Sequence, residues 1–189
     1  MRYYALKAII VLACISMLAG CAGAVKISPA ALMIDTYTDA ENKDKSFGED
    51  SRLWVASENG QPVRIAYLTF ANIATLPQQI SSGSLKIYAR EVERPGKVSI
   101  HFYNQSAMDI ITWADQPEYG PEALGILDIQ EPGWQTWDAT ALVKKAAVEC
   151  SEGCPFAVVL VAEGDASIGF ASMEGSAEEK AVLQYQSSS

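Results

Sequence analysis

The sequence has little of several residue types on which large classes of function depend. Its 189 residues include one His, so most His-based metal sites are excluded and a Ser-His-Asp hydrolase would depend on His101 alone. There are 14 Lys and Arg residues against 23 Asp and Glu residues, which argues against nucleic-acid binding, since that needs clustered cations. No nucleophile elbow, zinc-binding helix motif or glycine-rich phosphate loop occurs. The 49% of apolar residues still predict one acidic domain with a packed core.

Long hydrophobic runs are also scarce. Residues 8–18 are mostly apolar and follow Arg2 and Lys7, but a helix needs about 20 apolar residues to span a bilayer. A basic start, a short apolar stretch and small residues after it are typical of a secretory signal peptide, which we predict over residues 1–20. This segment holds two cations and no acid, so the rest of the sequence has a net charge of −11, against −9 for the whole.

The apolar stretch ends in Leu18-Ala19-Gly20-Cys21, which resembles the lipobox of bacterial lipoproteins. The resemblance implies cleavage before Cys21, lipidation of its thiol and a lipidated tether over residues 21–33. Two or three acyl chains, at about 0.8 kcal/mol per buried CH₂, would anchor the protein firmly. Ala22 in place of Asp after the Cys implies the outer membrane or cell surface rather than the inner membrane. The alternative is an ordinary signal peptide whose small residues happen to precede a Cys.

Four cysteines occur in the sequence, and two of them belong to the export segment. Cys14 lies in the signal peptide and Cys21 at its end, which leaves Cys150 and Cys154. In an oxidising compartment these two would close a small loop and stabilise the fold by about 2 kcal/mol. A redox motif would have two residues between its cysteines rather than three, and a zinc site would need further ligands. We therefore predict a structural disulfide.

Period-2 alternation between turn signals recurs from residue 34 onward and predicts strands. Thr140 is placed to cap a short helix over residues 141–147. Many short strands with one helix predict an all-β fold, an antiparallel β-sandwich of jelly-roll type, over residues 34–186 with a tail at 187–189. The expected strands are 53–56, 64–70, 84–90, 97–103, 124–129, 133–137, 156–162, 167–171 and 181–185.

Residues 84–90 and 97–103 both alternate, and the turn at Arg94-Pro95-Gly96 predicts that they form a hairpin. With their apolar side chains in the core, the polar and aromatic ones would share an outward face. Such a face suits sugar rings, which stack on aromatics while charged groups bond hydroxyls or carboxylates. The same residue types are also common on any solvated strand face. The candidate ligand-binding residues are Lys86, Tyr88, Arg90, His101 and Tyr103.

An acidic segment near the start of the domain is a candidate calcium site. Calcium takes six to eight oxygen ligands, often from one loop. The segment lacks the regular spacing of an EF-hand and is interrupted by lysines, so a solvated loop is the alternative. The candidate ligands are Asp35, Asp39, Asn42 and Asp44. No other cofactor is expected.

Several motifs, in order, resemble the DNRLRE domain, a β-sandwich classed among carbohydrate-binding modules and related to a methanogen disaggregatase. They include Asp35-Thr36-Tyr37, Leu53-Trp54-Val55, the segment 111–117 and Phe170-Ala171-Ser172-Met173-Glu174. The resemblance covers about residues 34–186, and it departs from the family at Met173, where Arg is usual. It implies a non-catalytic domain of the kind found in exported polymer-active enzymes and surface proteins.

Together these features predict an exported, lipid-anchored, non-catalytic protein that binds a glycan or another cell-surface polymer. One alternative is a structural or assembly subunit of the cell envelope with a protein partner. Another is a polysaccharide-degrading enzyme, because acids such as Asp109, Asp115 and Glu118 surround Trp113. For these acids, a turn shaped by Asp115 is the simpler interpretation, and we predict no catalytic residue.

Overall fold

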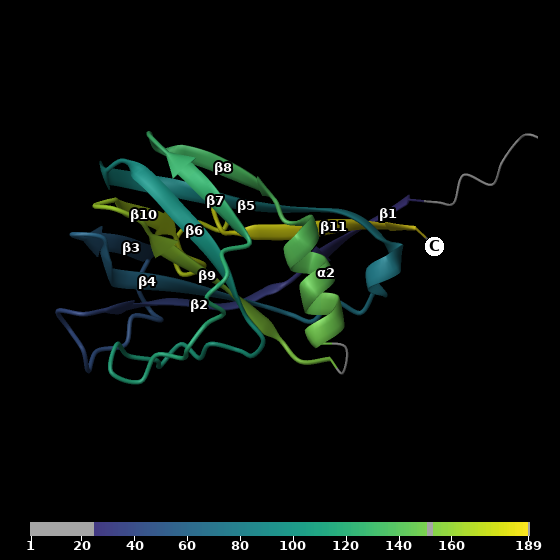
Figure 1. The fold of residues 1–189 in the computed structure, drawn as a ribbon, viewed down its shortest axis with the longest axis horizontal. Helices are drawn as coiled ribbons and strands as arrows, with labels where there is room; N and C mark the ends of the chain where they lie inside the picture. The colour runs from purple at the N-terminus through teal and green to yellow at the C-terminus, as the bar shows by residue number, and fades with distance from the viewer. Residues whose placement is uncertain (1–24, 151–152, 189) are drawn as a thin grey trace, which may run out of the picture.

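The computed structural model describes residues 25–150 and 153–188. Within these residues the chain forms eleven strands, one short 3₁₀ turn (Pro77–Gln79) and one α-helix, α2 (Thr140–Glu149). The prediction of an all-β sandwich with one short helix is confirmed (Figure 1). The strands are β1 (Val25–Ala30), β2 (Leu32–Asp39), β3 (Arg52–Glu58), β4 (Gln61–Phe70), β5 (Ile80–Arg94), β6 (Gly96–Tyr103), β7 (Gly125–Ile129), β8 (Gly133–Asp138), β9 (Phe156–Ala162), β10 (Ser167–Ala171) and β11 (Val182–Ser188).

The strands pair antiparallel in one continuous sheet that curls around its core. Its order is β1-β11-β5-β10-β3-β4-β9-β6-β7, with β2 also paired to β4 and β8 to β5. We call β1, β11, β5 and β8 the first layer, and β2, β4, β9, β6 and β7 the second layer. Strands β10 and β3 connect the two layers, since β10 pairs with the second half of β5 and β3 with the start of β4.

Strand β9 shows how the two apolar clusters are arranged. Val158 and Leu160 belong to the main core between the layers, whereas Val159 and Val161 face the other way into a second cluster. Period-2 alternation sends successive side chains to opposite faces, so a strand covered on both faces needs an unbroken apolar sequence. Burying each such side chain contributes about 1.5–3 kcal/mol. The second cluster is covered by residues 104–124, which contribute Ile111, Trp113 and Tyr119 among others.

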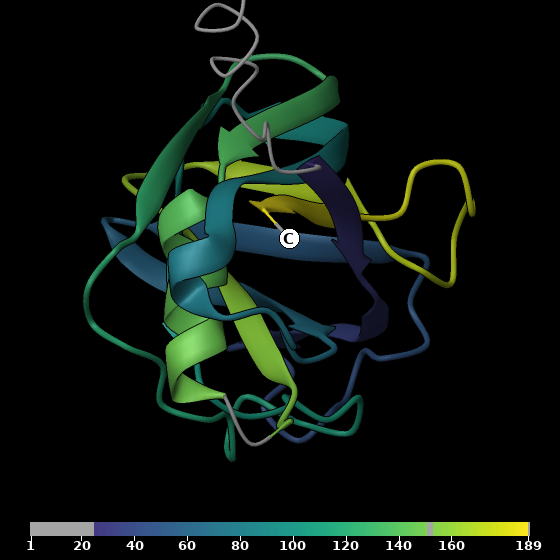
Figure 2. The same ribbon diagram turned by 90° about the vertical axis from the view of Figure 1, so that its right-hand side faces the viewer.

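Helix α2 packs at one end of the first layer, beside β5 (Figures 1 and 2). Close approach is possible because β5 has Gly83 there: a Cβ at this position would lie 2.9 Å from the Ala139 carbonyl oxygen and from Val143. The predicted Thr140 cap is wrong, since Ala139 is the N-cap and makes no side-chain cap bond. Thr140 instead accepts from the Gly83 N–H at 2.9 Å, which ties the helix to the strand.

Three predicted features of the chain path are corrected by the pairing. Part of the predicted tether is a strand, because β1 pairs along its whole length with β11 from Val25↔Ser188 to Ala30↔Leu183. Part of the predicted tail is likewise a strand, since β11 runs to Ser188. The predicted hairpin is wrong: β5 pairs with β11, β10 and β8, while β6 pairs with β7 and β9. The turn between β5 and β6 therefore leads from one layer to the other.

Candidate functional site

The first layer has one face toward the core and one toward solvent. Along β5 the side chains of Leu85 and Ile87 are buried, whereas Lys86 is exposed and Tyr88 half-buried. The strands on either side alternate in the same way. We call the solvent side of this layer the outer face, and its residues are Val25, Ile27 and Pro29 of β1, Val182, Gln184 and Gln186 of β11, Ser82, Ser84, Lys86 and Tyr88 of β5, and Trp134, Thr136 and Asp138 of β8.

The strand register arranges these side chains in rows across the sheet. Directly paired residues point to the same face, with their Cβ atoms about 5 Å apart. Ser84 is flanked by Gln184 on β11 and by Asp138 on β8. In the next row toward the C-terminus of β5, Lys86 lies between Val182 and Thr136, and the row after that pairs Tyr88 with Trp134. The remaining row contains Ser82, Gln186 and Ile27.

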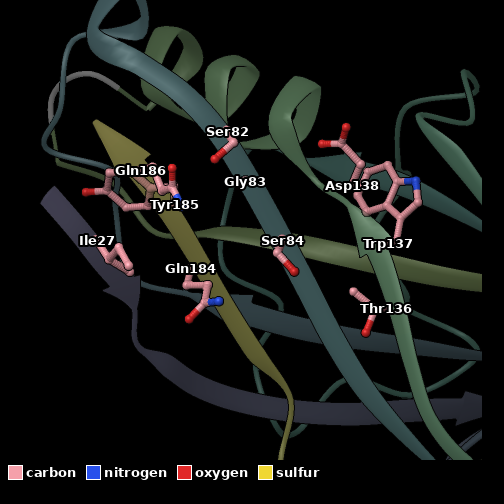
Figure 3. Close-up of a pocket in the computed structure, with 10 residues that line it drawn as sticks. All are labelled: Ile27, Ser82, Gly83, Ser84, Thr136, Trp137, Asp138, Gln184, Tyr185 and Gln186. Atoms are coloured by element: carbon pink, nitrogen blue, oxygen red, sulfur yellow. The ribbon is translucent and has the colours of Figure 1, made fainter. Parts of the chain in front are cut away.

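A groove of about 360 Å³ runs over this part of the outer face (Figure 3). That volume lies within the range of about 300–1,000 Å³ that is usual for small-ligand sites. Most of its lining side chains end in a hydroxyl, an amide or a carboxylate, and β1, β11, β5 and β8 all contribute. The lining residues are Ile27, Ser82, Gly83, Ser84, Thr136, Trp137, Asp138, Gln184, Tyr185 and Gln186.

Two aromatic rings stand beside the groove on the same face. Tyr88 and Trp134 meet edge to face with ring centroids 5.3 Å apart. Trp134 is 47% exposed, an unusual exposure for so large an apolar side chain. Its neighbour on β8, Trp137, instead packs against the main core. Trp134 is thus the tryptophan of β8 that can offer its ring to a ligand.

Asp138 is the carboxylate of the groove, and hydrogen bonds from Thr140 favour its ionised form. Its Oδ1 accepts from the Thr140 hydroxyl at 2.5 Å and from the Thr140 N–H at 2.9 Å. These bonds hold the pKa of Asp138 below its usual value, the hydroxyl having the larger effect. Because both bonds end on Oδ1, Oδ2 is the oxygen that can accept from a ligand.

The structure divides the five predicted binding residues between the two layers. Lys86 and Tyr88 lie on the outer face, as expected. His101 lies on β6 of the second layer and is 8% exposed, with its ring nitrogens 2.9 Å from the Gly120 carbonyl oxygen and 3.1 Å from Ser99 Oγ. Tyr103, also on β6, packs against the second cluster. The predicted common face is therefore wrong, because it assumed that β5 and β6 pair.

The fifth predicted residue, Arg90, lies farther along β5 and has a partner. Its Nε donates to Glu179 Oε2 at 2.6 Å, and both side chains are less than one-third exposed. The ion pair joins β5 to the segment between β10 and β11. Arg90 is consequently not a free cation of the outer face.

The four candidate calcium ligands do not converge in the structure. Asp35 and Asp39 lie four residues apart on β2, a separation of about 13 Å along an extended strand. Asp39 accepts from Asn42 and from Arg64 Nε, both at 3.2 Å, while Asp44 is exposed. Within residues 25–150 and 153–188, the structure has no cluster of three or more His, Cys, Asp or Glu side chains placed to hold a metal.

Asp35 itself is a buried carboxyl group of the second layer. It is 2% exposed, and its Oδ2 accepts from the Met173 N–H at 2.8 Å, whereas its Oδ1 has no hydrogen-bond partner among the described residues. The pKa of Asp35 is raised to about 7, chiefly because the group is buried; the bond from the Met173 N–H lowers the pKa, and the nearby Glu174 carboxylate raises it. Asp35 thus holds the start of the β10–β11 connection in place. The free-energy cost of burying its carboxyl group depends on pH, because the group can lose its proton.

Among the acids around Trp113, Asp115 shapes a turn. Asp115 Oδ1 accepts from the Thr112 N–H at 2.7 Å and from its hydroxyl at 2.6 Å. Trp113 packs against the second cluster. The interpretation of Asp115 as a turn residue is confirmed.

Cys150 and Cys154 are free thiols in the structure. Burial raises the pKa of the Cys150 thiol to about 12, with a smaller contribution from Cys154 beside it. Their disulfide stays a prediction for an oxidising compartment. The lipobox-like segment with Cys21 lies outside the described residues.

No helix among the described residues is long and apolar enough to cross a membrane.

Several residues of the outer face were not predicted from the sequence. They are Trp134, Thr136 and Asp138 of β8, Gln184 and Gln186 of β11, and Ile27 of β1. The alternation in residues 133–138 was visible and could have marked Trp134, Thr136 and Asp138 as one face. Nothing local indicates that β8 and β11 flank β5.

Comparison with known families identifies the family of this chain. Residues 26–186 match carbohydrate-binding module family 96. A search among curated proteins found no match. The family match begins within β1 and ends within β11, so it spans the whole sandwich, including the strand that was expected to be a tether. The chain belongs to carbohydrate-binding module family 96.

Proposed function

We propose that this protein binds a glycan in the groove of the outer face and does not cleave it. The observation that supports this best is the combination of a groove lined by hydroxyl, amide and carboxylate side chains with the exposed Trp134 ring on one sheet face, in a chain whose family binds carbohydrate. The order of motifs that resembles the DNRLRE domain agrees with such a role. The groove is formed by strand register, so it needs no ligand to organise it.

Each group in the groove has a task in holding a sugar. The amides of Gln184 and Gln186 both donate and accept, as do the hydroxyls of Ser82, Ser84 and Thr136, which matches the mixed hydrogen bonding of sugar hydroxyls. The Trp134 ring offers an apolar platform for the C–H face of a pyranose ring. Tyr88 supports that platform from the neighbouring strand.

The carboxylates support a binding role rather than hydrolysis. Glycoside hydrolysis uses two carboxyl groups that flank the bond, one of them with a raised pKa so that it can act as an acid. Among the described residues that line the groove, Asp138 is the one carboxylate. Its pKa is lowered, so it stays ionised and is suited to accepting hydrogen bonds.

The binding role is tested by affinity electrophoresis of the purified protein in gels that contain single polysaccharides. Trp134→Ala should weaken retardation about tenfold, since it removes the stacking surface. Ile126→Ala is the matched control, because Ile126 is also about half exposed but lies on β7 of the second layer. No retardation by any polysaccharide, or equal retardation of both variants, would contradict the proposal.

We also propose that the protein is exported and held at a membrane by lipid on Cys21. The support is the order of Arg2, the apolar stretch, and Leu18-Ala19-Gly20-Cys21. Cys21→Ser should abolish metabolic labelling by palmitate and leave an unprocessed precursor, whereas Cys14→Ser should do neither. Palmitate labelling that persists in Cys21→Ser would overturn the anchor.

A further inference from the structure

One end of the sandwich is built from segments without acidic residues, although the protein as a whole is acidic. The start of β1, the last residues of β11 and the connection from β4 to β5 meet there (Figures 1 and 2). Val25 pairs with Ser188, and the neighbouring Ser187 pairs with Ile80. These segments, which we call the β1 end, are residues 25–31, 71–83 and 183–188. They contain no Asp or Glu and one cation, Lys26, whereas the whole sequence has 23 acids.

The β1 end exposes three large apolar side chains. Val25, Ile27 and Leu76 are 66%, 62% and 63% exposed. Val25 and Ile27 lie on the same face of β1, which is the edge strand of the first layer, and Leu76 directly precedes the 3₁₀ turn. Apolar side chains that are exposed together, rather than singly, are typical of a surface that contacts a partner or a membrane.

Helix α2 lies beside the β1 end and leaves its charge positive. The helix packs against β5 and the 3₁₀ turn. It contains Lys144, Lys145 and one acid, Glu149, whose Oε1 lies 2.6 Å from Lys145 Nζ. The β1 end and α2 together therefore have three lysines and one acid, and that acid is paired. Such a surface is not repelled by the anionic headgroups of a bilayer.

The chain between Cys21 and β1 is short. Three residues separate Cys21 from Val25, so the Cα atoms of these two residues lie at most about 14 Å apart. Acyl chains on Cys21 would hold that residue at the bilayer surface. Val25 already belongs to the sandwich, because β1 is paired with β11 from its first residue. A lipid anchor on Cys21 therefore brings the β1 end to the membrane before any other part of the sandwich.

From these observations we infer that the β1 end docks on the lipid surface of the membrane that holds the protein. Val25, Ile27 and Leu76 lie against the boundary between headgroups and acyl chains, and Lys26 pairs with lipid phosphate. The inference rests on the proposed lipid on Cys21 and specifies how the anchored domain is oriented. Without such docking, the anchor would leave the tilt of the domain open.

The docking also sets the direction of the groove. Ile27 and Ser82 lie in the row of the outer face that is nearest the β1 end, whereas Tyr88 and Trp134 lie farther along the sheet. Six positions separate Ser82 from Tyr88 on β5, a rise of about 20 Å. Strands β1, β11 and β5 run along the long axis of the molecule (Figure 1). The Trp134 ring therefore lies farther from the bilayer, where a polymer can reach it.

The test measures how close each part of the lipidated protein lies to the lipid surface. The ¹⁵N-labelled protein, purified with its lipid, is placed in nanodiscs of phosphatidylcholine and phosphatidylglycerol that carry a gadolinium-chelate lipid. Its NMR signals are compared with those in the same nanodiscs without gadolinium. We expect the largest loss of intensity at the amides of residues 25–27, 76–80 and 186–188, and little loss at the Trp134 indole N–H.

A pair of matched variants tests the role of the apolar side chains. Val25→Glu places a carboxylate against anionic lipid and should reduce the signal loss at the β1 end about twofold. Ile126→Glu is the control, because Ile126 is also an exposed strand residue but lies on β7 of the second layer. It should leave the signal loss unchanged. Circular dichroism of each variant confirms that it is folded.

The outcomes separate this inference from the proposed anchor. A mature protein without lipid on Cys21, by mass spectrometry, would overturn the anchor and this inference with it. A lipidated protein whose signal loss is even over its surface, is largest at Trp134 or is the same in Val25→Glu would overturn the docking and keep the anchor. A dimer that Val25→Glu dissociates would assign the β1 end to a second copy of the chain and would also overturn the docking.

Discussion

At the scale of single residues, the sandwich buries the carboxyl group of Asp35 away from water. This carboxyl group is buried beside Glu174. Its Oδ2 accepts from the Met173 N–H, and its Oδ1 has no hydrogen-bond partner among the described residues. A buried carboxylate with one satisfied oxygen is costly when charged. The folded protein therefore holds the Asp35 proton more tightly than the unfolded chain does.

This predicts a pH dependence of stability with a defined sign. The pKa of Asp35 rises from 3.8 to about 7 on folding, so the free energy of unfolding should fall as pH rises from about 4 to about 7. Asp35→Asn keeps an acceptor for the Met173 N–H and removes the titration. At pH 8 it should be more stable than the natural protein by on the order of 3 kcal/mol, measured by urea unfolding.

The control for this prediction is another aspartate of the same region. Asp44 is exposed, so Asp44→Asn should leave the slope of stability against pH unchanged. Glu174→Gln should reduce the slope in part, because Glu174 raises the pKa of Asp35. An Asp35→Asn variant with the same slope as the natural protein would show that Asp35 is not the titrating group.

At the scale of elements, the sequence predicts which residues are strands better than which strands are neighbours. Alternation along residues 84–90 depends only on adjacent residues, and it correctly places Leu85 and Ile87 in the core. The partners of β5 come from β8 and β11, about 50 and 100 residues farther along the chain. No local pattern specifies such pairing, and the turn at Pro95 is equally compatible with a strand that crosses to the other layer.

Because local patterns do not specify strand neighbours, the sequence identified only some of the residues on the outer face. Lys86 and Tyr88 were identified because their outward direction follows from β5 alone. His101 was wrongly included because Ser99 and His101 alternate like outward residues, while residues 104–124 cover that side of the second layer. Trp134 was not predicted, since its exposure depends on what packs on β8.

One close contact between elements supports the groove and can be tested. A Cβ on Gly125 of β7 would lie 2.1 Å from Trp137 Nε1, and Trp137 lines the groove from β8. Gly125→Ala should therefore displace the indole and destabilise the fold by about 1–3 kcal/mol in urea unfolding. Ile126→Ala on the same strand is half exposed and should change stability by about 0.5 kcal/mol or less. Equal effects of the two changes would contradict a tight β7–β8 contact.

At the scale of the whole molecule, the curled sheet gives the two layers different surroundings. The second layer is covered on its far side by residues 104–124, so its outward residues form a second cluster. The first layer has the groove and the exposed Trp134 on its far side. One sheet thus supplies both a covered layer that stabilises the fold and an open layer that can bind.

The net charge of −9 affects which ligands can approach the protein. An acidic chain repels polyanions at a distance, and this long-range effect weakens with salt. If Cys21 holds the protein to a membrane by lipid, many copies on one surface would add avidity to individually weak contacts.

The most direct test of the central claim is a titration of the ¹⁵N-labelled protein with an oligosaccharide of the polymer that it binds, followed by amide chemical shifts. We predict shift changes confined to β5, β8, β11 and β1, together with the indole N–H of Trp134. Shift changes confined to β2, β4, β9, β6 and β7 or to residues 104–124 would contradict the claim that the outer face of the first layer is the glycan-binding surface.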